Sequence, residues 1–172
     1  MDALEYLSNG YEFSVVAGTS TAGIPWGEAL ADRDRLRKGF VYVRDKPKDH
    51  GKKNRIEGVE DNGLNGEKVI LIEDLVSTGG SSVSAIEAIR EMGGDCTVCL
   101  SIFGYGLPQA ESAFGRLQPQ ATLESVLSYD TLIEVGRANG HISDADLEKL
   151  VEWKSDPFNW GDKHGFPKVE KK

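Results

Sequence analysis

The sequence contains little cysteine, since Cys96 and Cys99 are the only two among 172 residues. They form a CxxC pair, but no second pair of cysteine or histidine residues is present to complete a zinc site. Both lie in residues 96–103, whose apolar pattern is typical of a β-strand, and residues i and i+3 of a strand point to opposite faces. We therefore expect both to be small core residues rather than metal ligands or redox groups.

Long apolar runs are also missing. No stretch is long enough to cross a bilayer, and residues 1–5 have neither the basic start nor the apolar run of a signal peptide. We therefore expect a cytoplasmic protein. A hydrophobic content of 39% over 172 residues fits one globular domain with a substantial core.

Positive charge is scarce, because 20 basic residues stand against 28 acidic ones and the net charge is −8. This balance argues against nucleic acid as the main partner. Residues 44–55 are the exception, with six Lys and Arg residues and two acids. They overlap residues 45–66, which show no strand or helix pattern. We interpret residues 45–66 as a mobile lid over an anionic ligand; the alternative is a solvated charge run.

Short apolar runs alternate with amphipathic segments along most of the chain. This alternation predicts an α/β fold with a parallel, Rossmann-like sheet and helices on both faces. We expect a core domain at residues 1–155 and a C-terminal tail at 156–172. The expected strands are residues 13–17, 40–44, 68–73, 97–103 and 121–127, and the expected helices are residues 24–36, 81–92, 108–117, 129–138 and 143–153.

The most informative stretch is VILIEDLVSTGGSS, residues 69–82. An apolar strand ends in Glu73 and Asp74, and a turn rich in glycine and hydroxyl groups then opens a helix. Gly79 and Gly80 let backbone N–H groups approach phosphate oxygens. Carboxylates repel phosphate but suit sugar hydroxyls, or a Mg²⁺ chelated by them. The expected ligand is a phosphorylated sugar; the alternative is an ordinary β-to-α connection with capping residues.

Two common nucleotide-binding patterns are absent. The turn lacks the Lys of a GxxxxGK[ST] loop, and no GxGxxG follows a strand. Instead, residues 69–82 resemble the phosphoribosyl-pyrophosphate (PRPP) motif of type I phosphoribosyltransferases. Residues 16–24 (VAGTSTAGI) and 42–58 (YVRDKPKDHGKKNRIEG), with 101–103 and the helix end at 152–153, are similar to orotate phosphoribosyltransferases. The resemblance covers most of residues 10–155.

The resemblance implies the type I phosphoribosyltransferase fold and a glycosyltransferase activity. The implied reaction transfers phosphoribose from PRPP to orotate, giving orotidine 5′-monophosphate and pyrophosphate in the biosynthesis of pyrimidines and UMP. It also implies Mg²⁺ as cofactor, bound through substrate oxygens and water with no firm protein ligand, and a homodimer as the assembly. In this family the lid commonly reaches the neighbouring subunit's site.

The resemblance further assigns roles to the motif residues. Lys48 and Asp74 are implied to be catalytic, and Ser77 is implied to touch orotate. The implied pyrophosphate loop consists of Thr19, Ser20, Thr21, Ala22 and Gly23. The implied PRPP-binding residues are Arg44, Lys48, His50, Glu73, Asp74, Leu75, Val76, Ser77, Thr78, Gly79, Gly80 and Ser81.

Three features depart from the family pattern. Asp45 stands where some members carry a second cation, and Thr21 and Ala22 occupy a region where some carry a lysine. Family members also have an N-terminal segment, the hood over the base, before the first motif strand, which here begins by about residue 13. We therefore expect the hood to be missing and the PRPP half of the site to be the more complete. Two alternative functions stay open: transfer to another base, and PRPP binding without catalysis.

Overall fold

The computed structural model describes residues 1–33, 39–46, 54–59 and 63–166. The chain forms two compact units, Met1–Ser128 and Tyr129–Lys172. The second unit contains α5 (Tyr129–Ala138), α6 (Asp144–Ser155) and α7 (Trp160–Lys163). The division predicted at residue 155 lies inside this unit and stays a prediction. Over the described residues, none of the helices combines the length and apolar character that a membrane span needs.

The first unit is built on a six-stranded sheet in the order β3-β2-β1-β4-β5-β6. Neighbouring strands are parallel except for the antiparallel pair β2 and β3. Because a parallel sheet is buried on both faces, it needs helices on both. The strands are β1 (Val15–Thr19), β2 (Gly39–Val43), β3 (Ile56–Glu57), β4 (Lys68–Val76), β5 (Asp95–Gly104) and β6 (Thr122–Ser128).

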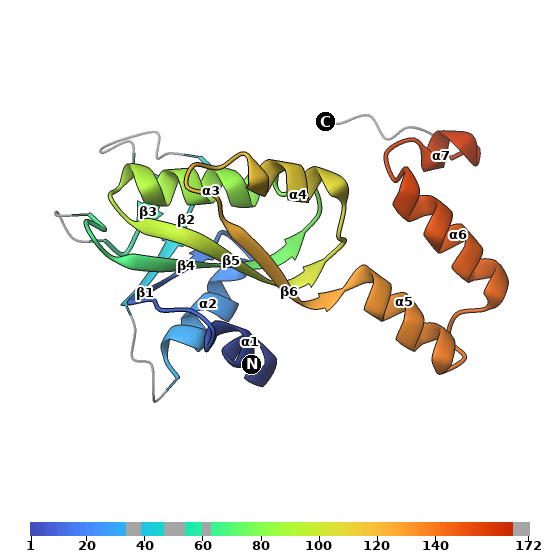
Figure 1. Ribbon diagram of the computed structural model, residues 1–172, viewed down its shortest axis with the longest axis horizontal. Helices are drawn as coiled ribbons and strands as arrows, with labels where there is room; N and C mark the ends of the chain where they lie inside the picture. The colour runs from blue at the N-terminus through green and yellow to red at the C-terminus, as the bar shows by residue number, and fades with distance from the viewer. Residues whose placement is uncertain (34–38, 47–53, 60–62, 167–172) are drawn as a thin grey trace. The chain divides into compact units, whose positions relative to one another are not determined.

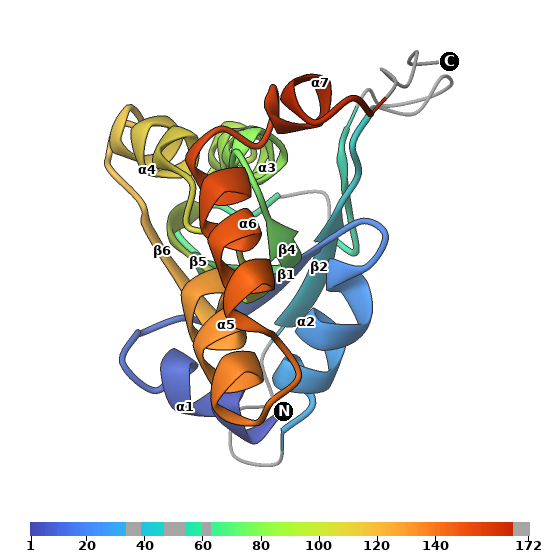
Figure 2. The same ribbon diagram turned by 90° about the vertical axis from the view of Figure 1, so that its right-hand side faces the viewer.

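Helices α1 (Asp2–Ser8) and α2 (Gly23–Ala31) cover one face of the sheet, and α3 (Gly80–Glu91) and α4 (Pro108–Gly115) cover the other (Figures 1 and 2). Side chains of β4 alternate between the two layers. Ile70 and Ile72 belong to the core cluster under α1 and α2, whereas Val69 and Leu71 belong to the cluster under α3. The predicted α/β fold, with a mostly parallel sheet and helices on both faces, is confirmed.

The prediction that Cys96 and Cys99 point to opposite faces is wrong. Both are fully buried in the same core cluster, next to α3. The reason is a bulge in β5: Lys68 of β4 lies opposite Asp95, but Ile70 lies opposite Val98, so β5 carries one extra residue between these pairs. Their predicted role as core residues is confirmed, and burial raises the pKa of the Cys96 thiol to about 12.

Some element boundaries also differ from the prediction. Residues 45–66 were expected to lack secondary structure, yet they contain β3, whose Ile56 is buried. A two-residue strand is too short to show a period of its own. Strand β4 continues to Val76 instead of ending at Glu73, because β5 accompanies it as far as Gly104. Helices α1 and α7 are further elements that the sequence pattern did not indicate.

Candidate active site

The predicted motifs meet at one edge of the sheet. Strand β1 lies between β2 and β4, and all three run in the same direction, so their carboxyl ends are neighbours. The segments that follow them begin at Ser20, Arg44 and Ser77. Ligands of open α/β sheets bind at this edge.

The loop after β1 is fastened to both neighbouring strands. The Ser20 N–H donates a hydrogen bond to the Val43 carbonyl of β2 at 2.8 Å, and the Thr19 hydroxyl donates to the Ile72 carbonyl of β4 at 3.3 Å. A Cβ atom on Gly23 would lie 2.6 Å from the Ile72 oxygen and would also strike the Thr19 hydroxyl. The predicted pyrophosphate loop, residues 19–23, is therefore held close to the carboxylate pair of β4.

Glu73 and Asp74 come directly after the point where β1 and β4 stop pairing, which is at Gly18 and Ile72. Glu73 is only 7% exposed, and its buried Oε2 atom has no hydrogen-bond partner among the described residues, while Asp74 is half-buried. Burial raises the pKa of the Glu73 carboxyl to about 7; the Thr19 hydroxyl opposes this shift. An orphan buried carboxylate oxygen is costly, which is typical of a site that awaits a ligand.

Glu73 should make the folded protein less stable as the pH rises. Its folded pKa of about 7 lies above its ordinary value of 4.5. The stability that its proton contributes is therefore fully present below about pH 4.5 and is lost as the pH rises through 7. Glu73→Gln keeps the shape of the protonated acid but does not titrate. It should raise the Tm by several degrees at pH 8 and change it little at pH 5.

Thermal unfolding followed by circular dichroism at the two pH values measures this effect. The exposed Glu87 of α3 offers a matched control, because Glu87→Gln removes a carboxylate from the same unit without touching the site. A Tm difference for Glu73→Gln that is equal at pH 5 and pH 8 would contradict the expected titration.

The turn between β4 and α3 forms the predicted phosphate cradle. Gly79 has a φ of +78°, in the left-handed region, and a Cβ there would lie 3.1 Å from the Phe114 ring and 3.3 Å from the Ala110 Cα. The N-cap residue of α3 is Gly79, which has no side chain to cap the helix, so the first N–H groups keep their hydrogen-bonding capacity for a ligand. Ser77 and Thr78 are half-buried in the turn, whereas Gly80 and Ser81 are exposed at the helix start.

Leu75 and Val76 belong to β4 rather than to the turn, and they pair with β5. Leu75 is 40% exposed and Val76 is buried. Arg44 is the described member of the predicted basic PRPP contacts. Its Nη1 atom lies 3.3 Å from the Oε1 atom of Glu57 in β3. Lys48 and His50 lie outside the described residues, as does part of the predicted lid.

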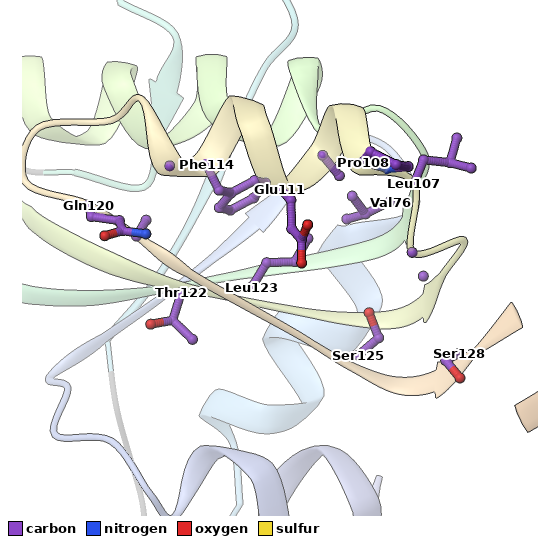
Figure 3. Close-up of a pocket in the computed structure, with 15 residues that line it drawn as sticks. Val76, Leu107, Pro108, Glu111, Phe114, Gln120, Thr122, Leu123, Ser125 and Ser128 are labelled. Carbon is purple, nitrogen blue, oxygen red and sulfur yellow. The ribbon is translucent and has the colours of Figure 1, made fainter. Parts of the chain in front are cut away.

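A cavity of about 560 Å³ lies between α4 and the strands β5 and β6 (Figure 3). Glu111 and Phe114 project into it from α4, and Ser125 comes from β6. Among the described residues of the predicted site, Val76 alone lines this cavity. We assign the cavity no ligand. The ring of Phe114, which lines it, also lies close to Gly79.

In the sequence, Arg55 stands out only as one charge of the basic segment at residues 44–55. In the structure its guanidinium group joins the end of β2 to α3 through hydrogen bonds to Arg44 and Ser84. These partners are 11 and 29 residues away. No local sequence pattern signals contacts at such separations.

Comparisons with known proteins decide the family. No protein-family model matches the chain. It is 45% identical over 143 residues to the orotate phosphoribosyltransferase of Staphylococcus saprophyticus subsp. saprophyticus, which covers 83% of this chain and 67% of that protein. It is 45% identical over 151 residues to that of Listeria monocytogenes serotype 4b, with 87% and 68% covered. The chain belongs to the orotate phosphoribosyltransferase family.

A solved structure agrees with this assignment. The crystal structure of the orotate phosphoribosyltransferase from Aeropyrum pernix matches with a TM-score of 0.62 at 30% identity, over 78% of this chain and 73% of that one. The family, the type I phosphoribosyltransferase fold and the enzyme class predicted from the sequence are thereby confirmed. The chain spans about two thirds of the length of the Staphylococcus and Listeria relatives.

Proposed function

We propose that this chain transfers phosphoribose from PRPP to orotate and releases pyrophosphate. The observation that best supports the proposal is the buried Glu73 carboxylate, whose Oε2 atom has no hydrogen-bond partner among the described residues. It lies between the tight loop after β1 and the start of α3, where the N-cap residue Gly79 has no side chain. In this arrangement, carboxylates that can accept hydrogen bonds from sugar hydroxyls lie between two groups of backbone N–H donors, one in the loop after β1 and one at the start of α3. A sugar with phosphate groups at both ends has the complementary pattern.

The cradle, residues 77–81, binds the 5′-phosphate in this proposal. The N–H groups at the start of α3 and the hydroxyls of Ser77, Thr78 and Ser81 supply the donors. Glu73 and Asp74 accept hydrogen bonds from the ribose hydroxyls. Ser77 also contacts orotate.

The pyrophosphate lies over residues 19–23 and is contacted by Arg44, Lys48 and His50. The bond between C1 of ribose and the pyrophosphate oxygen breaks, and a bond from C1 to the orotate ring nitrogen forms. The departing pyrophosphate keeps the electron pair of the broken bond, and its oxygens accept the proton that the orotate ring nitrogen loses. Positive charge builds on the ribose ring during this displacement, so the Asp74 carboxylate stabilises the ring while Lys48 stabilises the leaving group.

The donor set also fits Mg²⁺, which we propose as the cofactor. Carboxylates beside sugar hydroxyls and phosphate oxygens are the oxygen ligands that Mg²⁺ prefers. Glu73 and Asp74 would orient the hydroxyls that bind the ion, so substrate oxygens and water would be its ligands. When bound, the ion neutralises charge on the pyrophosphate.

We also propose a homodimer and a cytoplasmic location. The homodimer rests on the family resemblance, in which the lid of one subunit commonly serves the neighbouring site. The cytoplasmic location rests on the sequence pattern described in the first subsection. The same resemblance leaves transfer to another base as the alternative function.

Initial rates with PRPP and Mg²⁺ test the proposed reaction directly. Orotate, uracil, adenine and hypoxanthine serve as acceptors, and chromatography separates the nucleotide products. We expect orotidine 5′-monophosphate to form from orotate and little product from the other bases. Faster turnover of a different base would replace orotate as the acceptor. PRPP binding without turnover of any base would favour the non-catalytic binding module.

A further inference from the structure

Arg55 connects three segments around the candidate site. Its Nε atom donates to the Arg44 carbonyl at 2.8 Å, at the end of β2. Its Nη1 atom donates to the carbonyl and the hydroxyl of Ser84, at 3.0 and 2.8 Å. Ser84 lies in α3, the helix whose first turn belongs to the phosphate cradle. The planar guanidinium group suits this task, because its donors point in fixed directions.

The same short hairpin also holds Arg44. Its backbone N–H donates to the Arg55 carbonyl at 2.8 Å, so residues 44 and 55 exchange two hydrogen bonds. The Arg44 guanidinium lies 3.3 Å from the Glu57 carboxylate of β3. Both the backbone and the side chain of Arg44 are therefore held by residues 55–57, next to Val43, whose carbonyl fastens the loop at Ser20.

We propose that Arg55 is a positioning residue that aims Arg44 at the pyrophosphate group of PRPP. The inference rests on the proposed function, because it takes Arg44 as a pyrophosphate contact. Arg55 itself touches no substrate in this scheme. It fixes the end of β2 against α3, so that the cation at residue 44 and the cradle at residues 77–81 keep the separation that one PRPP molecule requires.

A second arginine in the same helix layer provides a matched control. Arg90, near the end of α3, donates from Nε and Nη2 to the Cys96 carbonyl at 3.0 and 2.7 Å. Like Arg55, it is partly buried and joins α3 to a strand through a backbone carbonyl. It lies at the other end of the helix from the cradle. Arg55→Gln removes bonds at the second turn of α3, and Arg90→Gln removes similar bonds at its last turn.

The test compares two ligands by calorimetric titration: Mg²⁺ with PRPP, and ribose 5-phosphate. Ribose 5-phosphate fills the cradle and the carboxylate pair but has no pyrophosphate to reach Arg44. Arg55→Gln should weaken PRPP binding about tenfold and ribose 5-phosphate binding less than twofold, because hydrogen bonds to charged groups are among the stronger ones. Arg90→Gln should leave both affinities within twofold of the wild type.

Two further variants separate geometry from charge. Arg55→Lys keeps the positive charge but loses the planar set of guanidinium donors. This variant should therefore bind PRPP almost as weakly as Arg55→Gln. Ser84→Ala removes one of the two acceptors on α3 and should weaken PRPP binding about two- to threefold. In steady-state kinetics, Arg55→Gln should raise the KM for PRPP without changing the KM for orotate.

Several results would overturn the inference. Equal losses of affinity for both ligands would mean that Arg55 acts on the cradle and not through Arg44. Full rescue by Arg55→Lys would mean that charge rather than geometry is the contribution. Equal effects of Arg55→Gln and Arg90→Gln would indicate general destabilisation. If the wild type binds PRPP but does not use orotate, the proposed function fails while this comparison of affinities still decides the role of Arg55.

Discussion

Asp74→Asn should lower kcat/KM for PRPP by about a hundredfold and leave the fold intact. In the proposed function Asp74 accepts hydrogen bonds from ribose hydroxyls and faces a ring that becomes positive in the transition state. Hydrogen bonds to charged groups contribute about 1.5–3 kcal/mol each, and about 1.4 kcal/mol corresponds to a tenfold change in rate. The Asn side chain keeps the shape but loses the charge. Steady-state kinetics with PRPP as the varied substrate measures the loss.

The position of Asp74 makes this test specific. It is half-buried at the carboxyl edge of the sheet, whereas Asp95 is exposed at the start of β5, near the opposite edge. Asp95→Asn removes the same charge from the same sheet and should leave kcat/KM within twofold of the wild type. A similar Tm for both variants shows that folding is preserved. Normal turnover of the Asp74→Asn protein would remove this carboxylate from the reaction.

Local sequence patterns were enough to predict most of the helices and strands of the fold. The apolar runs at residues 69–72 and 97–103 belong to the central strands β4 and β5, and the hydroxyl-rich turn at 77–81 opens α3 as expected. These features depend on side-chain periodicity and on glycine, which act over a few residues. The parallel order of the sheet follows from right-handed connections between such units.

Pairing between distant strands was not visible in the sequence. The bulge in β5 places Cys96 and Cys99 on one face, because register depends on the neighbouring strand β4 and not on β5 alone. Strand β3 exists because residues 56–57 find a partner in β2. From local pattern alone, we expected regular alternation of side chains at Cys96 and Cys99 and a loop at residues 56–57.

The candidate site shows the same division. The residue types at 73–81 indicated a sugar with phosphate groups, since their chemistry is local. The orphan oxygen of Glu73 depends on burial by surrounding elements, and the bonds of Arg55 to Arg44 and Ser84 depend on the folded hairpin. The sequence could therefore indicate the class of ligand, but not the burial and the hydrogen bonds that hold the ligand-binding residues in place.

The cradle also depends on one backbone conformation, so Gly79→Ala should lower the affinity for ribose 5-phosphate more than tenfold. A φ of +78° in a residue with a side chain costs about 1–2 kcal/mol, and the added Cβ would lie 3.1 Å from the Phe114 ring and 3.3 Å from the Ala110 Cα. Because Ala110 offers backbone and not a flexible side chain, the turn must move instead. The N–H groups of the cradle then leave the phosphate.

Gly66→Ala is the matched control for this strain. Gly66 has a φ of +79° in the turn before β4, and a Cβ there would meet nothing within 4 Å. Both variants should therefore lose a similar intrinsic amount of stability, about 1–2 kcal/mol, but only Gly79→Ala adds the contact with α4 and displaces the cradle. We expect the Tm to fall further for Gly79→Ala, and ribose 5-phosphate affinity to fall more than tenfold in that variant alone. Equal affinities of the two variants would show that the left-handed turn at residue 79 serves only to connect β4 with α3, and that the phosphate is held elsewhere.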